Sequence, residues 1–331
     1  MGKSNMNQTS AMSVEREVPT LPDLKRNVFE PRSLVNSTLN LLAWIMAVLA
    51  CMPLFSVLIR LIVRGSQRLS WSIFTELPPT AFEMGGGFGN AILGTVVMVA
   101  IAMVLSVPLG ILAAVFLAEF GPESKLAATA RFCAKTLTGL PSILAGVFAY
   151  ATVVLLTGSY SAPAGGIALA LLMVPTVLLT AEEAMKMVPR IMKDAAHGMG
   201  CTPTQVMTKV VIPTAMPGII TGVILAVARA AGETAPLLFT ALFSEYWLFH
   251  GGHVALMQPT ASLAVLIYNF SGMPYENQIE LAWTASLFLV FMVLILNLVS
   301  RAIGQRDTGV VTMVMVIRKM IRGRKEQGEK Q

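Results

Sequence analysis

The sequence predicts an all-α polytopic membrane protein that crosses the bilayer with six helices. Of the 331 residues, 55% are hydrophobic and only 13% are charged, and the mean hydropathy is +0.70. Uncharged runs of membrane-spanning length recur between Leu41 and Ser300. Most Lys and Arg residues gather in the segments that separate these runs. Together these patterns are typical of a chain that lies in a lipid bilayer.

Each predicted span is an apolar run close to the roughly 20 residues that an α-helix needs to cross the hydrocarbon core. The runs and their flanks predict a transmembrane domain over residues 39–303, with a long polar cytoplasmic loop inside it at residues 182–217. The six spans cover about residues 41–63, 91–118, 136–158, 164–181, 218–243 and 281–300.

The two ends of the chain are polar. Residues 1–38 carry Ser, Asn, Thr, Pro and charges of both signs. They lack the apolar surface for a packed core, so we expect a disordered tail. No cleavable signal peptide is expected, because the first apolar run lies too far in and is too long. Residues 304–331 end in a cluster of Arg and Lys and are predicted to lie against anionic lipid.

Both ends are predicted to be cytoplasmic. An even number of spans places the two termini on one side of the membrane, and 20 of the 24 Lys and Arg residues flank the spans on that side. Only Arg64 and Arg68 flank them on the other side. Because positive residues favour the cytoplasmic side, this asymmetry sets the orientation. It also accounts for the net charge of +6 without a nucleic-acid partner.

Proline and glycine mark places where the predicted spans depart from simple helices. Pro108, Pro141 and Pro175 fall inside spans, where each removes a backbone donor and favours a kink or a broken helix. Such breaks often lie beside a transport pathway, and kinks tolerated for packing alone are an equal alternative. Gly218 and Gly222 form a small-xxx-small spacing that lets another helix approach closely.

The fifth span contains two opposite charges in an otherwise uncharged run. Arg229 and Glu233 are four residues apart, which is about one turn of a helix. An uncompensated Arg or Glu near the centre of a membrane helix costs about 2.5–3.5 kcal/mol. Such a cost indicates a polar pathway for a substrate, and a structural salt bridge between helices is the alternative.

The loop at residues 182–217 has helix signals of its own. One short helix is predicted near Asp194 and ends at Gly200. A second is predicted from about Pro203 to Val211, because Thr202 can cap it and Gln205 follows three residues later. Pro213 and Pro217 are expected to stop that helix. Two short helices joined by a glycine turn form a compact projection that is suited to docking into a soluble partner.

The remaining features predict no chemistry. The run from Gly85 to Gly89 is read as a flexible entry to the second span, and residues 261–270 as an interfacial or re-entrant helix. The three histidines and three cysteines lack metal-ligand or redox spacing, so no metal site is expected. Gly2-Lys3-Ser4 has no glycine at the spacing of a nucleotide-binding loop, so the chain is expected to bind no ATP itself.

Two motifs resemble those of a known family. Asp194-Ala195-Ala196, Gly200 and Ile212-Pro213 resemble the loop by which permeases of ATP-binding-cassette importers dock onto their ATPase, although the family usually has Glu where Asp194 stands. The stretch from Arg229 to Thr240 resembles the signature of phosphate importer permeases of the PstA type. Weaker similarities at residues 85–95, 139–143 and 263–274 extend the resemblance over roughly residues 85–300.

The resemblance implies a type I importer permease fold, called MetI-like, and a non-catalytic subunit in the bacterial inner membrane. It implies a second permease, two ATPase subunits that use ATP and magnesium, and an external phosphate-binding protein. Arg229 matches the pathway arginine of the family, and Glu233 matches the residue that holds this arginine when no anion is bound. Thr234 and Ser142 are further pathway candidates, because they are polar groups predicted near the same depth.

Three other functions stay open from the sequence. A permease for another tetrahedral oxyanion would carry the same arginine. A secondary anion transporter would also place Arg in a broken helix, but it would not need the docking loop and should show an inverted repeat. A scaffold subunit would make no contact with the substrate.

Overall fold

The computed structural model describes residues 31–250 and 253–328 of the chain, and these residues fall into two compact units that divide after Val57. The regular elements of the described residues are helices apart from one pair of two-residue antiparallel strands. Within this part of the chain, five helices are long and apolar enough to cross a membrane, or six if the bent helix pair counts as one span. The predicted all-α class with six spans is therefore confirmed.

The first helix, α1, covers Pro31–Gly65 and is followed by the short 3₁₀ helix η1 at Ser66–Arg68. The apolar side chains at residues 35–57 are exposed on all sides, as expected of a helix that faces lipid, whereas Leu61 near its end is buried. Residues 31–38 are helical here, so this part of the predicted disordered tail is wrong, while residues 1–30 lie outside the described residues. Proline at the first helical position and the apolar run behind it explain the earlier start.

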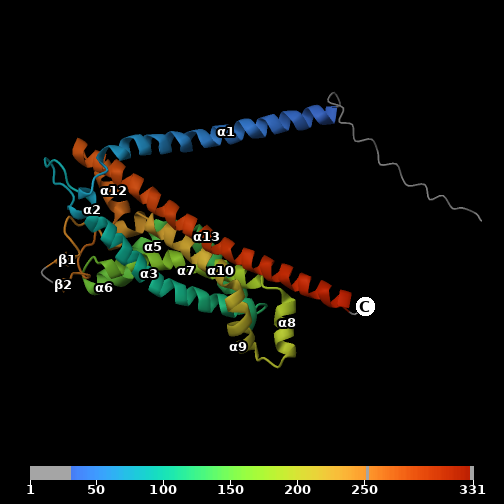
Figure 1. Cartoon of the computed structure of the whole chain (residues 1–331). Coiled ribbons are helices and arrows are strands. Elements are labelled where there is room, and N and C mark those ends of the chain that lie inside the picture. Colours follow the sequence, from blue (N-terminus) through green and yellow to red (C-terminus); the bar gives the residue numbers. More distant parts are fainter. Residues whose placement is uncertain (1–30, 251–252, 329–331) are drawn as a thin grey trace, which may run out of the picture. The chain divides into compact units, whose positions relative to one another are not determined.

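The core of the larger unit is built on α7, which covers Ala162–Lys186. It packs against α3 at Gly89–Val115 and α10 at Ile212–Ala231 (Figure 1). Small residues set these distances, because a Cβ atom on Gly110 of α3 would lie 2.8 Å from the Val177 side chain. A Cβ atom on Gly218 of α10 would lie 2.8 Å from Ala184. The predicted close approach at Gly218 is thus confirmed.

The third span is bent at Pro141, as predicted, but it begins at Lys125, before the predicted residues 136–158. Helix α4 covers Lys125–Gly139 and ends before Pro141, and a bend of 103° separates it from the following helix. That helix consists of α5 at Ser142–Ala149, the π-helical turn η3 at Tyr150–Val154 and α6 at Leu155–Thr157. Pro141 holds the preceding Leu140 in an extended conformation, which explains the break.

The polar loop folds as the local signals predict, but it joins the fifth span without a stop. Helix α8 covers Arg190–Gly198, and α9 at Pro203–Val206 begins with the predicted capping box of Thr202 and Gln205. The π-helical turn η4 at Met207–Val211 then continues directly into α10, so the expected stop at Pro213 and Pro217 is wrong. The wider π turn lies where Pro213 lacks its backbone donor, which allows the helix to continue.

The fifth span ends earlier than predicted. Helix α10 stops at Ala231, and a separate short helix, α11, covers Ala235–Thr240. The run at residues 218–243 is therefore a broken helix. Pro236 cannot donate to the carbonyl four residues before it, so one regular helix cannot pass through this point.

The other elements gather at the end of this unit opposite α8 and α9 (Figure 1). The glycine loop before α3 is fixed by close approach, because a Cβ atom on Gly87 would lie 2.6 Å from a backbone oxygen. The short helix predicted near residues 261–270 is present as α12 and is largely buried. The elements are α2 at Ser72–Thr75, β1 at Phe249–His250, β2 at His253–Val254, α12 at Leu263–Ser271 and the start of α13 at Glu276–Gly328.

Candidate functional site

Arg229 and Glu233 lie at the break between α10 and α11. Arg229 is in the last turn of α10, and its carbonyl accepts a hydrogen bond of 3.1 Å from the backbone N–H of Gly232. The N–H of Glu233 donates to the carbonyl of Ala230 at 3.2 Å, and Thr234 directly precedes α11 without a capping hydrogen bond from its side chain. These tight turns end the helix, so the carboxylate of Glu233 leaves from non-helical backbone.

The two charges are close without forming a tight hydrogen bond. Nε of Arg229 lies 3.6 Å from Oε1 of Glu233, whereas a charge-assisted hydrogen bond spans about 2.7–2.9 Å. The side chain of Arg229 is 50% exposed and that of Glu233 is 17% exposed. The guanidinium thus keeps donors available on its open side. Within this chain the pair joins the last turn of α10 to the turn that follows it.

The exposed position of Arg229 follows from the packing of α10. Its sequence neighbours Ala228 and Ala230 are buried against the core, so the arginine leaves the opposite face of the helix. Leu225, one turn earlier, is exposed on this face as well. A half-exposed guanidinium at the end of a membrane helix is costly against lipid, so this face needs a polar environment.

The predicted candidates Thr234 and Ser142 lie on two short helices that pack together. A Cβ atom on Gly146 of α5 would lie 2.6 Å from Cα of Pro236 in α11, so the two backbones touch. Thr234 begins α11 two residues before this contact, and Ser142 begins α5 one turn before it. Both side chains are partly exposed. Among the described residues, neither side chain forms a hydrogen bond or ion pair with Arg229, whose ion-pair partner is Glu233.

The residues predicted to dock onto an ATPase sit on the α8–α9 pair and the turn that follows it. Asp194 and Ala195 are exposed on α8, whereas Ala196 is buried against Met185 of α7 and Val206 of α9. Gly200 forms the turn with φ at +85°, a conformation that L side chains rarely adopt. Ile212 is partly buried and Pro213 is exposed at the start of α10.

The outer surface of the α8–α9 pair combines apolar and polar side chains. Ile191 of α8 and Met199 just after it are exposed, and so is Asp194; Met187, which lies between α7 and α8, is exposed as well. His197 is also exposed, and its Nδ1 lies 3.3 Å from the carbonyl of Cys201, as fits a surface histidine. An exposed apolar surface on a compact projection is typical of a protein–protein contact.

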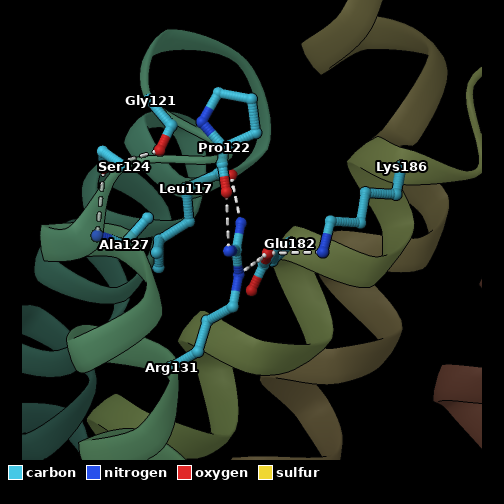
Figure 2. Close-up of polar contacts among 8 residues, drawn as sticks. All are labelled: Leu117, Gly121, Pro122, Ser124, Ala127, Arg131, Glu182 and Lys186. Atoms are coloured by element: carbon cyan, nitrogen blue, oxygen red, sulfur yellow. Dashed lines mark hydrogen bonds and ion pairs between the residues drawn. The ribbon is translucent and has the colours of Figure 1, made fainter.

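A charged cluster ties α4 to α7 (Figure 2). Arg131 of α4 donates from Nε to Oε1 of Glu182 at 2.6 Å, and Nζ of Lys186 lies 2.6 Å from the same oxygen. Arg131 also donates to the carbonyls of Leu117 at 2.6 Å and Pro122 at 2.8 Å. The Glu182 side chain is only 4% exposed, so this carboxylate is buried with two positive partners.

A further ion pair links α8 to the end of α3. Lys193 pairs with Glu119, which lies in η2, a π-helical turn at Phe116–Phe120. The two side chains are 18% and 24% exposed. No group of three or more His, Cys, Asp or Glu residues in the described part of the chain is placed to hold a metal ion.

The protein family follows from comparison with known sequences. The model of the family described as "Binding-protein-dependent transport system inner membrane component" matches residues 106–306. The chain belongs to this family. The matched region contains α4 to α12 and therefore both the charge pair and the α8–α9 pair.

Curated relatives from bacteria and an archaeon place the chain among permeases of the PstA type. "Phosphate transport system permease protein PstA" of Yersinia pestis is 39% identical over 247 residues, covering 75% of this chain and 82% of the relative. "Phosphate transport system permease protein PstA 1" of Mycobacterium tuberculosis strain H37Rv is 33% identical over 301 residues, covering 88% and 95%. The "Probable phosphate transport system permease protein PstA" of Methanocaldococcus jannaschii is 34% identical over 251 residues, covering 75% and 86%.

Solved structures of ABC transporters contain chains with the same fold. A chain of a bacterial alginate ABC transporter in complex with its periplasmic protein aligns with a TM-score of 0.58 at 13% identity, covering 84% of this chain and 97% of that one. A chain of the MetNI methionine ABC transporter aligns with a TM-score of 0.50 at 20% identity, covering 66% and 92%. The predicted MetI-like permease fold is confirmed.

The contacts of Glu182 and of Glu119 with basic side chains were not predicted from the sequence. Their partners Arg131, Lys186 and Lys193 were interpreted only as positive residues that flank the spans. Glu182 and Glu119 carry the signal that was available, because each is the first acidic residue after a long uncharged run. An acidic residue at the end of a permease span, close to several basic ones, indicates a partnered charge.

Proposed function

We propose that the chain is a transmembrane permease of an ATP-driven importer of inorganic phosphate. The observation that carries the proposal is the half-exposed Arg229 guanidinium at the α10–α11 break, in a chain whose relatives are named phosphate transport system permeases. A guanidinium offers a planar fork of donors that matches a phosphate group and stays charged at any working pH. Arg229 is the group that meets phosphate in the pathway.

Glu233 keeps this arginine compensated between transport cycles. The 3.6 Å separation of Nε and Oε1 provides attraction without a tight hydrogen bond. An arriving phosphate can therefore take the guanidinium donors without first breaking a short bidentate pair. When phosphate leaves, Glu233 again pairs with Arg229, so the guanidinium charge is not left without a partner in a low dielectric. Thr234 and Ser142 supply hydroxyl groups near the same path.

The pathway is shared with a second, related permease. The face of α10 that carries Arg229 is open in this chain, and Leu225 extends it toward α8 and α9. A second permease covers this face and gives Arg229 the polar surroundings that lipid lacks. The two permeases together enclose the route for phosphate.

The α8–α9 pair docks onto an ATPase subunit in the cytoplasm. The exposed Asp194 and Ala195 and the turn at Gly200 form its outer surface, and buried Ala196 joins it to α7. Two ATPase subunits bind ATP and magnesium, and an external phosphate-binding protein delivers the substrate. This chain carries out no catalysis and binds no cofactor. It lies in the bacterial inner membrane with both termini in the cytoplasm.

Uptake into proteoliposomes tests the whole proposal. The chain is reconstituted with the second permease, the ATPase and the phosphate-binding protein, and radioactive phosphate is measured inside the vesicles. Uptake should require ATP and should stop when ATP is withheld. Uptake that persists without ATP and follows an ion gradient would show a secondary carrier instead. Competition by arsenate and sulfate ranks the oxyanions that the pathway accepts.

Substitution of the arginine tests the site. Arg229→Ala should lower phosphate uptake by about a hundredfold or more, because it removes the donors that replace the hydration of the anion. Leu225→Ala changes the same exposed face without removing a charge and should retain uptake. Both variants should copurify with the ATPase. Normal uptake by Arg229→Ala would remove Arg229 from the pathway.

A further inference from the structure

The π-helical turn η2 lies where three parts of the larger unit meet. It continues α3, and the N–H of Gly121 closes it by donating to the carbonyl of Phe116, five residues earlier, at 3.0 Å. Such wide turns leave backbone groups free for other partners. In η2 the backbone carbonyl of Leu117 accepts from Arg131 of α4, and the side chain of Glu119 pairs with Lys193 of α8.

The contact with α8 is the Lys193–Glu119 pair. The two residues are 74 positions apart, so the pair joins segments that are remote along the chain. More than three quarters of each side chain is covered, with exposed fractions of 18% and 24%. Partial burial reduces screening by salt, and the pair is therefore stronger than an ordinary surface contact.

The contact with α4 is made by Arg131. Figure 2 shows its guanidinium reaching the carbonyls of Leu117 and Pro122, at 2.6 and 2.8 Å, while Nε donates to Glu182 on α7. The backbone of η2 and the end of α7 are thus held by one side chain. Lys186 supports Glu182 from the next turn of α7.

Apolar contacts follow the same route. The side chain of Leu117 in η2 is buried between Ala127 and Ala134 of α4 and Leu178 of α7. One turn earlier, Ala114 of α3 packs in a buried cluster with Ala196 of α8. The end of α3 therefore contacts the α8–α9 pair on one side and the α4–α7 pair on the other.

We infer that Glu119 and Lys193 are positioning residues for ATP-coupled transport, which pass the displacement of α8 to the end of α3. Arg131 passes it from there to α4 and α7. The inference rests on the proposed function and adds the contact through which the ATPase moves the spans. The chain itself links α8 only to α7 and, through α9, to α10, so α3 needs a noncovalent link. Apolar packing has no direction, whereas an ion pair fixes two atoms together.

Neutral substitutions test the pair in the full complex in proteoliposomes. Glu119→Gln and Lys193→Gln should each lower the phosphate imported per ATP hydrolysed by about tenfold, while the ATPase stays bound. Glu123→Gln, an exposed carboxylate four residues away, is the matched control and should retain the ratio. The charge swap Glu119→Lys with Lys193→Glu should restore most of it. The inference would be overturned if the single variants kept the normal ratio of phosphate imported to ATP hydrolysed. It would also be overturned if the charge-swapped double variant had a ratio as low as that of the single variants.

A chemical link tests whether the two segments move together. Glu119→Cys and Lys193→Cys are combined in a chain whose three native cysteines are replaced by Ser. A short, reducible bifunctional thiol reagent should restore transport per ATP, and reduction should abolish the gain. If the cross-linked complexes transport as little phosphate per ATP as the reduced complexes, the pair does not transmit motion.

A third measurement separates this inference from the proposed function. Hydrolysis of ATP by the complex in detergent, with and without the external binding protein, needs no transport of phosphate. Glu119→Gln should retain basal hydrolysis and lose most of the stimulation by the binding protein. If the unmodified complex fails to import phosphate, the proposed function fails, and the stimulation still decides whether Glu119 transmits the signal. Full stimulation in Glu119→Gln would reject the role of the pair.

Discussion

Two charged regions of the same chain differ in how completely their charges are partnered. At the α4–α7 cluster, the 4% exposed side chain of Glu182 receives contacts of 2.6 Å from both Arg131 and Lys186. At the α10–α11 break, Arg229 is 50% exposed and stands 3.6 Å from Glu233. The first arrangement gives one oxygen of a nearly buried carboxylate two positive partners. The second keeps an arginine in place while leaving its donors open.

The difference teaches that a charge pair in a membrane protein is identified as structural or functional by its geometry. Removing one partner of a buried pair with short contacts destabilises the protein, because the other charge is left buried without its partner. An open pair at a helix break costs little to separate and can bind a passing ion. The four substitutions below test this contrast, from the largest expected effect to the smallest.

The largest effect is expected from the α4–α7 cluster. Arg131→Met should destabilise the chain by about 3 kcal/mol, because it leaves Glu182 buried with only Lys186 and removes the donor to two carbonyls of the η2 region. Arg229→Met, the matched change at the open pair, should cost under about 1 kcal/mol. Thermal unfolding of the purified complexes in detergent measures both. Equal losses would abolish the contrast between the two regions.

The next effect concerns the neighbours of the open pair. Gly146→Ala should lower phosphate uptake by about tenfold, because its Cβ would meet the Pro236 backbone and push α11 away from α5. Gly139→Ala is the matched control, since a Cβ atom there has no neighbour within 4 Å. Uptake assays of both variants decide the matter. Normal phosphate uptake by Gly146→Ala would show that the α10–α11 break tolerates a shift of α11 relative to α5.

A smaller effect is expected at the tip of the α8–α9 pair. Gly200→Ala forces an L side chain to φ of +85°, which costs about 1–2 kcal/mol and weakens the turn. Gly198→Ala, at the end of α8, should be neutral, because Ala suits a helix. The ATPase that copurifies with each variant is measured at increasing salt. Equal retention would show that the turn does not shape the docking surface.

The contrast between the regions also explains what the sequence could predict. Arg229 and Glu233 were found because charges four residues apart lie within one turn, and Thr202 and Gln205 because a capping box is local. The Arg131–Glu182 contact joins residues 51 positions apart, which local patterns cannot reveal.

Helix ends were the other limit. The helix was expected to stop at Pro213, but it continues. The π-helical turn η4 directly before it accommodates the backbone N–H that proline lacks. The break after Ala231 was missed because the apolar run continues through it, although Pro236 carried the signal. The roles of Arg229, Glu233, Thr234 and Ser142 in the pathway, and of Asp194 and Gly200 in docking, stay predictions.

The smallest effect tests whether the open pair acts with a hydroxyl nearby. Ser142→Ala should raise the phosphate concentration for half-maximal uptake by about two- to fivefold, because a neutral hydrogen bond contributes about 0.5–1.5 kcal/mol. The maximal rate should stay the same, since the change removes binding without changing the ATPase. Thr129→Ala is the control, because this exposed hydroxyl bonds only its own helix in α4. If Ser142→Ala leaves uptake unchanged while Arg229→Ala abolishes it, the arginine binds phosphate without Ser142, and the hydroxyl belongs to the packing of α5.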